Sequence, residues 1–363
     1  MIYRAIGVMS GSSLDGLDIV CAEFTFNSGL WQFKILAGEC FSYSDTWKNK
    51  LSSTIGLSAK EYMLLHSEYG HYLGSEINRF IEKHDLQYKV ALIASHGHTV
   101  FHLPAQKTTS QLGNGASIAA ETTLPVITDL RAIDVAFGGE GAPIVPIGEK
   151  LLFKEFDLFL NLGGIANLSV KSSQRFIAFD VCPANRVLNM ITETVGKEYD
   201  DNGNMASSGM VNEDLLNNLN AFEYYRKPYP KSLANDFGTD MVYPVVQSSG
   251  INADNQLRTY VQHIVYQVQS AIASLPPYTS NKKLLVTGGG AFNSFLVKQL
   301  KMELEKFKIE VELPEENIIN FKEALIMAFI GVLRWRQEYN VLSSVTGAQR
   351  DSIGGALWIG QEA

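Results

Sequence analysis

Two glycine-rich segments carry the residue types that bind phosphate. The first is GVMSGSSLDGLD, residues 7–18, and the second is NLGGIANL, residues 161–168. Each lies between two apolar runs rich in β-formers, which predicts a hairpin turn. Glycine lets the backbone approach a ligand closely, and successive N–H groups in a turn form a concavity that binds anions. A tight hairpin without a ligand would use the same residues, so spacing alone leaves both interpretations open.

The first turn offers the larger set of candidate nucleotide contacts, which are Gly11, Ser12, Ser13, Leu14, Gly16, Leu17 and Asp18. Asp15 cannot be there to bind phosphate directly, because like charges repel. Its carboxylate would instead hold a magnesium ion, or the waters of that ion, beside the phosphates.

The second turn adds Gly163, Gly164 and Asn167 as candidate contacts. A third glycine cluster, VTGGGAFN at residues 286–293, adds Gly288, Gly289, Gly290 and Asn293. Three successive glycines allow the backbone to approach a flat base or a ribose, although a loose strand–helix connection would look the same. Two similar turns and a third cluster together predict that a nucleotide is held between two similar lobes.

Three histidines, His96, His98 and His102, follow a buried strand in the segment SHGHTVFHL. The carboxyl end of a strand is where open α/β sheets place their ligands. Zinc ligation is one interpretation, but no carboxylate or cysteine accompanies the histidines. Hydrogen bonding to sugar hydroxyls uses the same residue types, so we favour His96 as a substrate contact.

Three charged residues are further candidates, each with an ordinary structural alternative. Arg131 could hold a carboxylate with its planar fork of donors, or simply pair with Asp129 or Asp134. Asp180 ends a strand, where it could accept a proton from water or a hydroxyl, or could cap the helix that follows. Glu323 lies near the start of the last long helix, where most glutamates only complement the helix dipole.

The elements that would position these residues follow a repeated order. In the first half, strands are expected at residues 2–9, 17–26, 31–43, 90–95 and 124–128, with helices at 60–84 and 117–122. In the second half, strands are expected at 158–162, 166–170, 176–180, 284–286 and 309–313, with helices at 185–195, 255–275, 292–307 and 321–339. A polar insert occupies residues 197–250.

The repeat of a βββαβαβ unit predicts an α/β fold with two similar lobes, each a mixed five-stranded sheet with flanking helices and a cleft between them. We expect lobe I at residues 1–130, with the C-terminal segment, about residues 340–363, as a candidate to return to it. Lobe II is expected at residues 131–339. A single doubly wound sheet is the alternative.

Composition is that of a globular protein, with 46% hydrophobic and 19% charged residues and a net charge of −8. This charge argues against a nucleic-acid surface. The three cysteines are scattered, which argues against a disulfide framework. We expect no membrane contact and a cytoplasmic location, because no long apolar run or signal peptide is evident.

Several motifs in order resemble the anhydro-N-acetylmuramic acid kinases of bacterial cell-wall recycling. They are GVMSGSSLDGLD, SHGHTVFHLP, QLGNGASIA, DLRAIDVAFGGEGAPIVP, NLGGIANLSV, DVCPAN, VTGGGAFN and KEALIMAFIGVL. The resemblance spans nearly the whole chain. It implies the duplicated ribonuclease H-like fold of two-lobed ATP-using proteins such as actin, hexokinase and the seventy-kilodalton heat-shock chaperones.

The resemblance also implies an activity and roles for named residues. The family uses ATP and magnesium to phosphorylate the 6-oxygen of 1,6-anhydro-N-acetylmuramic acid, and opens the anhydro bridge with water in the same event. By this resemblance Asp180 is the general base, and Thr99, Arg131 and Glu323 hold the sugar. A homodimer is implied as well.

The chain departs from the family pattern around the base. Residues 180–185 read DVCPAN where the family has DTGPGN, and residues 231–236 read KSLAND where it has KSTGRE. Ser12, His98, Ser110 and Glu140 replace the usual Thr, Gln, Trp and Gln. Two alternatives therefore remain: a kinase for another amino sugar, and a non-catalytic ATP-switched binding protein on the same fold.

Overall fold

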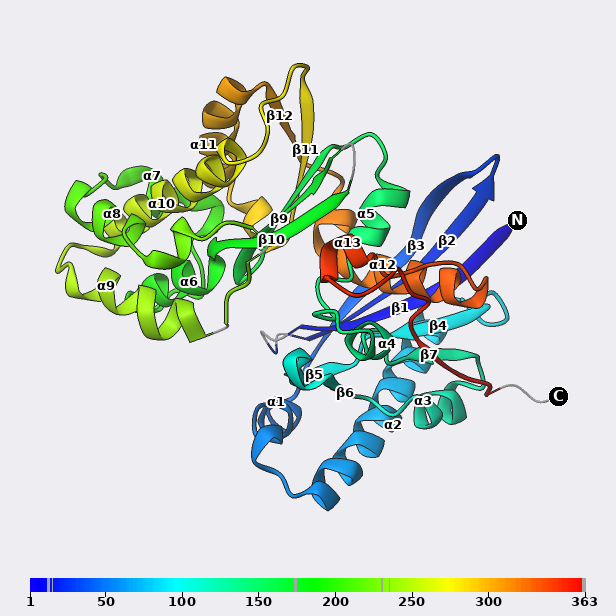
Figure 1. Ribbon diagram of the computed structural model, residues 1–363. Helices are drawn as coiled ribbons and strands as arrows, with labels where there is room; N and C mark the ends of the chain where they lie inside the picture. Colours follow the sequence, from blue (N-terminus) through cyan, green and yellow to red (C-terminus); the bar gives the residue numbers. More distant parts are fainter. Residues whose placement is uncertain (12–13, 15, 173–174, 230, 235, 361–363) are drawn as a thin grey trace. The chain divides into compact units, whose positions relative to one another are not determined.

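The computed structural model describes residues 1–11, 14, 16–172, 175–229, 231–234 and 236–360. The chain divides into two compact units (Figure 1). Unit 1 comprises Met1–Lys154 and Phe321–Ala363, and unit 2 comprises Glu155–Asn320. Each unit is described by itself.

Unit 1 is built on a six-stranded mixed sheet in the order β13-β7-β4-β1-β2-β3, beside a separate hairpin of β5 and β6. Its strands are β1 (Ile2–Ser10), β2 (Gly16–Asn27), β3 (Leu30–Ser42), β4 (Leu92–Ser95), β5 (His98–Leu103), β6 (Thr108–Leu112), β7 (Val126–Thr128) and β13 (Ala356–Trp358). Its helices are α1 (Asp45–Ser52), α2 (Ala59–Lys83), α3 (Gly115–Thr122), α4 (Ala132–Ala136), α5 (Pro146–Leu152), α13 (Ser343–Thr346) and most of α12 (Glu316–Trp335). Short 3-10 turns lie at Thr54–Gly56 and Pro104–Gln106.

Unit 2 is built on a five-stranded mixed sheet in the order β10-β9-β8-β11-β12. Its strands are β8 (Leu158–Leu162), β9 (Ile165–Lys171), β10 (Phe176–Pro183), β11 (Lys282–Thr287) and β12 (Ile309–Glu312). Its helices are α6 (Asn185–Glu193), α7 (Asn204–Ser208), α8 (Glu213–Asn220), α9 (Tyr243–Ser248), α10 (Ala253–Ala273) and α11 (Ser294–Leu304). A π-helix spans Phe237–Val242, and 3-10 turns lie at Asp201–Gly203, Glu223–Arg226, Gly289–Phe292 and Glu305–Phe307.

The two sheets share one topology, which confirms the expected duplication. In each, three antiparallel strands that follow one another in sequence are continued by two parallel strands beside the first of them, as β3-β2-β1-β4-β7 and β10-β9-β8-β11-β12 show. The first sheet has six strands rather than the expected five, because β13 pairs with the edge strand β7. This is the topology of the duplicated ribonuclease H-like fold, and a single doubly wound sheet is excluded.

The unit boundaries differ from the expected lobe boundaries. Residues 131–154 belong to unit 1, as does α12 from Phe321 onward. Helix α5 contacts β3, and α12 lies so close to β1 that a Cβ at Gly7 would be 1.8 Å from the carbonyl oxygen of Ala324. Only glycine permits this approach of helix to strand.

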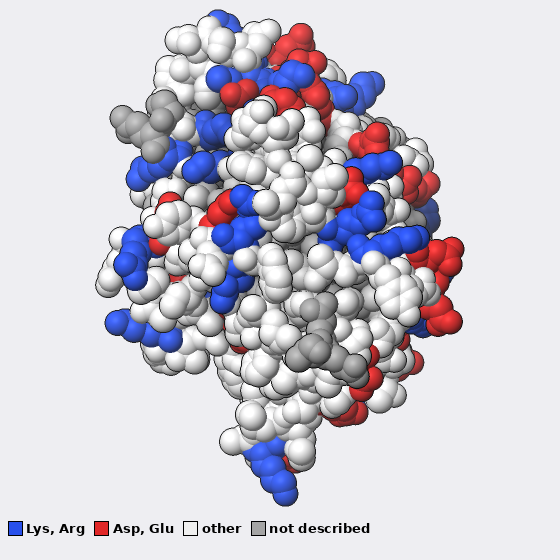
Figure 2. Space-filling view, turned by 90° about the vertical axis from the view of Figure 1, so that its right-hand side faces the viewer, with Lys and Arg blue, Asp and Glu red and all other residues white. Residues whose placement is uncertain are grey.

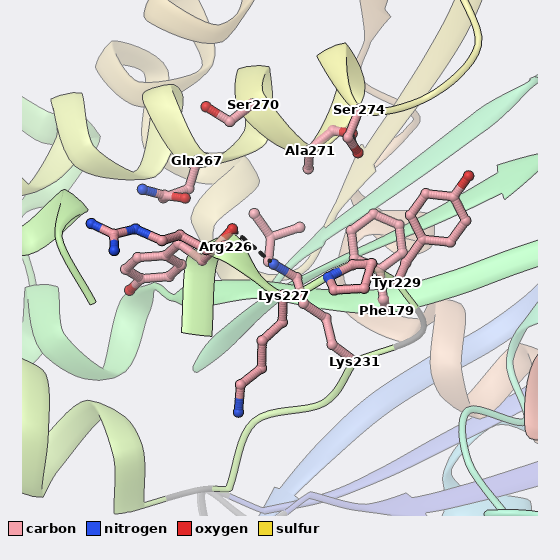
Figure 3. A pocket seen from close by; sticks show the side chains of 12 residues that line it. Phe179, Arg226, Lys227, Tyr229, Lys231, Gln267, Ser270, Ala271 and Ser274 are labelled. Carbon is pink, nitrogen blue, oxygen red and sulfur yellow. Dashed lines mark hydrogen bonds between the residues drawn. The ribbon is translucent and has the colours of Figure 1, made fainter. Parts of the chain in front are cut away.

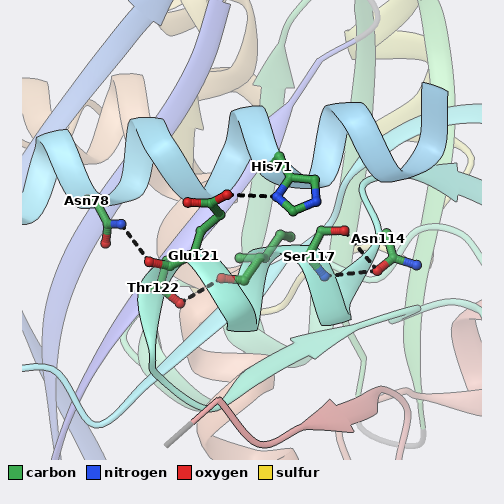
Figure 4. A network of polar contacts seen from close by, with 7 residues as sticks. His71, Asn78, Asn114, Ser117, Glu121 and Thr122 are labelled. Atoms are coloured by element: carbon green, nitrogen blue, oxygen red, sulfur yellow. Dashed lines mark hydrogen bonds and ion pairs between the residues drawn. The ribbon is translucent and has the colours of Figure 1, made fainter. Parts of the chain in front are cut away.

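Helix α2 illustrates how the sequence defines an element of unit 1. Ser58 and Glu61 form a capping box at its start, and Leu65, Tyr69 and Leu73 recur on its buried face. The other side of the helix contacts α3 through polar groups (Figure 4). There Glu121 joins α3 to α2, accepting from His71 Nδ1 at 2.7 Å through its carboxylate and from Asn78 Nδ2 at 2.8 Å through its carbonyl.

Charged side chains of both signs are interspersed on the face shown in Figure 2. No large field of one sign gathers on this face. Among the described residues, no helix is both long and apolar enough to cross a membrane.

Candidate functional site

A row of polar residues crosses the sheet of unit 2. Asn161 of β8 is paired with Asn167 of β9, which is paired in turn with Asp180 of β10. On the other side of β8, Thr287 of β11 is paired with Asn161. Directly opposed residues project on the same face of a sheet, so these four form one polar row. Only Asn167 and Asp180 were expected from the sequence as site residues.

Two members of the polar row have features that suit a ligand. Thr287 is fully buried, and its hydroxyl has no hydrogen-bond partner within the described residues. A buried polar group without a partner is costly, and a bound ligand or water would remove that cost. The register of β10 against β9 shifts between Asp180 and Cys182, and such bulges re-aim side chains next to active sites.

The Asp180 carboxylate is held by the backbone. Its Oδ2 accepts a hydrogen bond from the N–H of Leu233 at 2.8 Å. Burial raises the pKa of Asp180 above its usual range, and the Leu233 N–H opposes that rise because it favours the charged form. A carboxylate with a raised pKa is a stronger proton acceptor than an ordinary surface aspartate.

The second glycine turn is fastened to the loop that follows Asp180. The carbonyls of Gly163 and Gly164 accept hydrogen bonds from the N–H groups of Asn185 and Ala184, at 3.0 and 2.8 Å. The Asn185 side chain donates to the carbonyl of Leu162 at 2.8 Å. The changed residue Ala184 therefore contributes through its backbone, and these contacts do not depend on its side chain.

The third glycine cluster lies against the same turn. Gly288 has φ +80°, and a Cβ there would lie 2.5 Å from Asn161 Oδ1 and 2.9 Å from the carbonyl oxygen of Leu162. A Cβ at Gly290 would lie 2.6 Å from the Leu162 side chain and 2.9 Å from Asn185 Oδ1. Two of the three glycine-rich segments expected to bind nucleotide are thus neighbours in unit 2.

We expect Gly288→Ala to destabilise unit 2 and to weaken nucleotide binding, because the new Cβ would displace Asn161 and Leu162. Gly196→Ala is the matched control, since Gly196 also has a positive φ of +73° but no atom within 4 Å of an added Cβ. The control loses about 1 kcal/mol from backbone strain alone. Urea unfolding and titration with a non-hydrolysable ATP analogue measure both effects, and equal losses in the two variants would contradict the close approach.

Other expected nucleotide contacts have structural roles. Asn293 caps α11, accepting from the N–H of Leu296 at 2.9 Å, and Gly289 begins a 3-10 turn. Their contact with a nucleotide stays a prediction, in which Asn293 would use its side-chain N–H₂ group.

The first glycine turn joins β1 and β2 in unit 1. Leu14 has φ 59° and its N–H points to the carbonyl of Gly11 at 3.4 Å. Gly16, Leu17 and Asp18 begin β2, and the Leu17 side chain is fully buried in the core, which leaves only its backbone for a ligand. The predicted contacts Ser12 and Ser13 and the predicted magnesium ligand Asp15 lie outside the described residues.

A buried chain of hydroxyl groups supports this turn. Tyr69 and Tyr43 are joined at 2.6 Å, Tyr43 donates to Ser10 Oγ at 2.8 Å, and Ser10 lies 3.0 Å from His98 Nδ1. With Tyr43 donating, the Ser10 proton is directed at His98. Burial raises the pKa of Tyr43 to about 12 and lowers that of His98, so the chain is uncharged at neutral pH. The sequence did not indicate this role for the two tyrosines. Tyr69 recurs on the apolar face of α2, and Tyr43 directly follows strand β3, so the position of each is typical of a core residue.

Arg131 and His96 meet directly in unit 1. Arg131 Nε donates to His96 Nε2 at 2.8 Å, and Arg131 Nη1 donates to the carbonyl of Gly141 at 2.7 Å. Burial and the Arg131 charge lower the pKa of His96 to about 3, so the ring is neutral. Its Nδ1, 2.9 Å from the carbonyl of Gly97, therefore carries the proton.

Glu323 is electrostatically coupled to the same arginine. Burial lowers the pKa of Arg131 to about 10, while the charges of Glu323 and Asp134 oppose that fall. Burial raises the pKa of Glu323, and the charges of Lys322 and Arg131 oppose that rise. Three of the four expected sugar contacts, His96, Arg131 and Glu323, are therefore linked in unit 1. Thr99, the fourth, is exposed in β5.

The histidines that suggested zinc are engaged in protein hydrogen bonds. Each Nδ1 has a partner: Gly97 for His96, Ser10 for His98 and Thr109 for His102. No group of three His, Cys, Asp or Glu side chains is arranged to hold a metal within the part of the chain that the structure describes. We therefore retain the hydrogen-bonding interpretation.

Comparison with known proteins gives one consistent result. The model of the family described as "Anhydro-N-acetylmuramic acid kinase" matches residues 3–360. Proteins of that name from Hydrogenovibrio crunogenus and Francisella tularensis subsp. novicida are 31% and 30% identical, each over 97% of this chain and 97% of the relative. Among solved structures, component A of Acidaminococcus fermentans (R)-2-hydroxyglutaryl-CoA dehydratase aligns with TM-score 0.46 at 11% identity, over 90% of this chain and 96% of that one. That last likeness is too low to add to the argument.

Proposed function

The chain belongs to the anhydro-N-acetylmuramic acid kinase family, and on this premise we propose that it phosphorylates the 6-oxygen of 1,6-anhydro-N-acetylmuramic acid with ATP while water opens the anhydro bridge. The observation that carries the proposal for this chain is the position of Asp180. Its carboxylate lies in the polar row with Asn161 and Asn167, beside a bulge, and burial raises its pKa.

The chemistry assigned to Asp180 is general base catalysis. The carboxylate accepts one proton from water as the water oxygen bonds to the anomeric carbon C1 of the sugar. The bond from C1 to the bridging oxygen breaks, and that oxygen, still attached to C6, bonds to the γ-phosphorus of ATP. ADP leaves, and the proton on Asp180 passes to solvent. The products are ADP and N-acetylmuramic acid 6-phosphate.

Phosphoryl transfer requires positioning and charge neutralisation more than covalent help. We assign the nucleotide to the backbone of residues 163–164 and 288–290, and to the first turn with Gly11, Leu14, Gly16 and Asp18. The donor set of unit 2 fits magnesium, because carboxylate, amide and hydroxyl oxygens lie together in the polar row. The Thr287 hydroxyl in this row has no hydrogen-bond partner within the described residues. Asp15 remains the proposed magnesium ligand, directly or through water. Magnesium, when bound, neutralises phosphate charge.

The sugar is assigned to His96, Thr99, Arg131 and Glu323. Muramic acid carries a lactyl carboxylate, which an arginine can bind with two parallel N–H donors. Arg131 is suited to this because His96 and Gly141 already fix its guanidinium through Nε and Nη1. A guanidinium that is already held in place loses little conformational entropy when it binds the carboxylate.

Arg131→Lys is expected to raise the KM for the sugar at least tenfold while leaving nucleotide affinity unchanged. Lysine keeps the charge, but its donors all lie on one nitrogen, so it lacks the planar fork that reaches His96, Gly141 and a carboxylate together. Loss of a charged hydrogen bond typically has an effect of this size, about 1.5–3 kcal/mol. Steady-state kinetics with varied sugar measure the change, with Arg79→Lys on the exposed surface of α2 as the control. A KM within twofold of the wild type would remove Arg131 from the sugar site.

The function is tested by comparing two acceptors. The chain is incubated with ATP and magnesium, and with either 1,6-anhydro-N-acetylmuramic acid or 1,6-anhydro-N-acetylglucosamine, which lacks the lactyl group. We expect a sugar 6-phosphate from the first acceptor and little from the second. Equal rates would indicate a kinase for another amino sugar. Nucleotide binding without transfer to either sugar would indicate an ATP-switched binding protein.

Two further properties complete the proposal, and the first of them is inferred from the family resemblance alone. We propose a homodimer, which sedimentation equilibrium of the purified chain tests. We also propose a cytoplasmic location, where ATP is supplied.

A further inference from the structure

We propose that residues 224–229 and 231–233 form a clamp that positions Asp180 for catalysis, with Tyr224, Lys231 and the N–H of Leu233 as its positioning groups. The proposal rests on the proposed function, because it assigns a role around the same base. Residue 230 lies outside the described residues, and no part of the argument uses it. The segment belongs to the polar insert at residues 197–250.

The position of Asp180 in the sheet creates the need for a clamp. Strand β10 is an edge strand, with β9 on one side only. The outward backbone groups of an edge strand have no partner in the sheet. In addition, the register shift beside Asp180 interrupts the pairing with β9. A base in such a place would be poorly fixed by the sheet alone.

The segment satisfies three groups of Asp180 at once. The Asp180 N–H donates to the carbonyl of Lys231 at 3.1 Å. The Asp180 carbonyl accepts from the hydroxyl of Tyr224 at 2.8 Å, and the carboxylate Oδ2 accepts from the N–H of Leu233 at 2.8 Å. Both backbone groups and one carboxylate oxygen are therefore fixed by a single stretch of chain.

Lys231 holds the clamp together from the opposite face of β10. Its ammonium lies 4.7 Å from the centre of the Tyr224 ring and 3.4 and 3.5 Å from the carbonyls of Tyr224 and Tyr225. The ammonium thus links Tyr224, whose hydroxyl bonds the Asp180 carbonyl, to Lys231, whose own carbonyl bonds the Asp180 N–H. The ammonium therefore makes a cation–π contact with the ring and electrostatic contacts with the two carbonyl groups. Burial lowers the pKa of Lys231.

The Lys231 ammonium also borders a pocket of about 250 Å³ (Figure 3). Phe179 and Val181, the neighbours of Asp180 on β10, line one side of this pocket, and Gln267 and Ser270 of α10 line another. Alternation along the strand places Asp180 on the other face. The pocket is therefore not the reaction site, but it gives small molecules access to the place that the ammonium occupies.

The clamp explains why the altered family motif can still serve the base. Leu233 stands where the family has threonine, yet its contribution to Asp180 comes from the backbone N–H. A change of side chain at this position leaves that donor in place.

Leu233→Pro removes that one N–H, and Leu233→Ala keeps it. An N–H bonded to an ionised carboxylate stabilises the charged form, so its loss raises the pKa of Asp180 further. The base is active only when ionised, so the acid limb of the pH profile of kcat/KM is expected to move up by about one pH unit in Leu233→Pro. The acid limb of Leu233→Ala is expected to stay at the wild-type pH. If the acid limbs of Leu233→Pro and Leu233→Ala lay at the same pH, the clamp would be overturned.

Tyr224→Phe tests the clamp without a change in the backbone. It removes only the hydroxyl that bonds the Asp180 carbonyl. We expect kcat to fall about tenfold to a hundredfold, as misplacement of a catalytic group by about 1 Å does, with nucleotide affinity unchanged. A wild-type kcat would overturn the role of Tyr224, and an equal loss of nucleotide affinity would indicate general damage to unit 2.

Lys231→Ala allows chemical rescue through the pocket. We expect kcat to fall about tenfold or more, and ethylammonium chloride to restore part of it, because the small cation can occupy the vacated place. Tetramethylammonium chloride, which has no N–H donor, and sodium chloride at the same ionic strength are the controls. Equal rates with all three salts would overturn the proposed role of the ammonium.

Failure of the clamp can be distinguished from failure of the proposed function by Asp180→Asn. Undiminished turnover in Asp180→Asn would refute Asp180 as the base. Lost turnover in Asp180→Asn, together with wild-type kcat and pH profile in Tyr224→Phe and Leu233→Pro, would refute only the clamp.

Discussion

We expect Asp180→Asn to lower the rate of product formation by about 10²–10⁴-fold, the usual contribution of a positioned general base, while nucleotide affinity stays within about twofold of the wild type. The amide has nearly the same shape as the carboxylate and can still accept from Leu233, so the local structure is retained. It cannot take a proton from water. The loss therefore lies in the transition state rather than in nucleotide binding, and is measured as kcat against the affinity of an ATP analogue.

Asp214→Asn is the matched control for this variant. Asp214 is exposed at the start of α8 in the same unit, and its replacement changes the net charge equally. We expect wild-type kinetics for the control. If Asp180→Asn also showed wild-type turnover, Asp180 would have no part in the mechanism.

We expect Lys322→Met to destabilise unit 1 by about 3–5 kcal/mol, because it leaves a carboxylate buried without its counter-ion. Lys322 Nζ lies 2.8 Å from Glu149 Oε1, and each side chain is only 3% exposed. The second carboxylate oxygen, Oε2, is buried with no hydrogen-bond partner within the described residues. The pair joins α5 to α12, the helix that also carries Glu323.

The double variant Glu149→Met/Lys322→Met separates the pair from the packing around it. Replacing both charges by apolar groups of similar volume is often neutral or stabilising, so we expect the double variant to recover most of the loss. Urea unfolding of the wild type, both single variants and the double variant measures the coupling. A double variant as unstable as the sum of the two single variants would show that the charges are not coupled.

The order of elements could be predicted from the sequence because each strand and long helix has its own local signal. Strand β4 is a fully buried apolar run, and α2 carries an apolar face with a capping box. Strand β13 was missed because three residues, Ala356–Trp358, carry almost no periodic signal. They become a strand only by pairing with β7.

The polar row could not be predicted, because register depends on which residues pair and not on the residues alone. Asn161 and Thr287 have no special spacing relative to Asp180, and pairing across β8, β9 and β11 brings them into line. The pair of Glu149 and Lys322 is hidden for the same reason, since 173 positions separate them in the sequence.

The clamp was out of reach of sequence reasoning for a different reason. Two of its three bonds to Asp180 come from the backbone of Lys231 and Leu233, and backbone groups leave no trace in the residue type. Tyr224, the only side chain that bonds Asp180 directly from the clamp, reads as one aromatic residue among several in the insert. The motif at residues 231–236 shows changes of side chain, whereas the contacts to Asp180 come from the backbone of Lys231 and Leu233.

Reaction in oxygen-18 water is the most direct test of the central claim. The chain is incubated with ATP, magnesium and the anhydro sugar, and the product is fragmented in a mass spectrometer. Product incubated alone in the same water corrects for exchange at C1. We predict one oxygen-18 in the C1 hydroxyl and none in the phosphate ester. Oxygen-18 in released phosphate with the anhydro ring intact, or a phosphorylated sugar that has gained no water, would contradict the account.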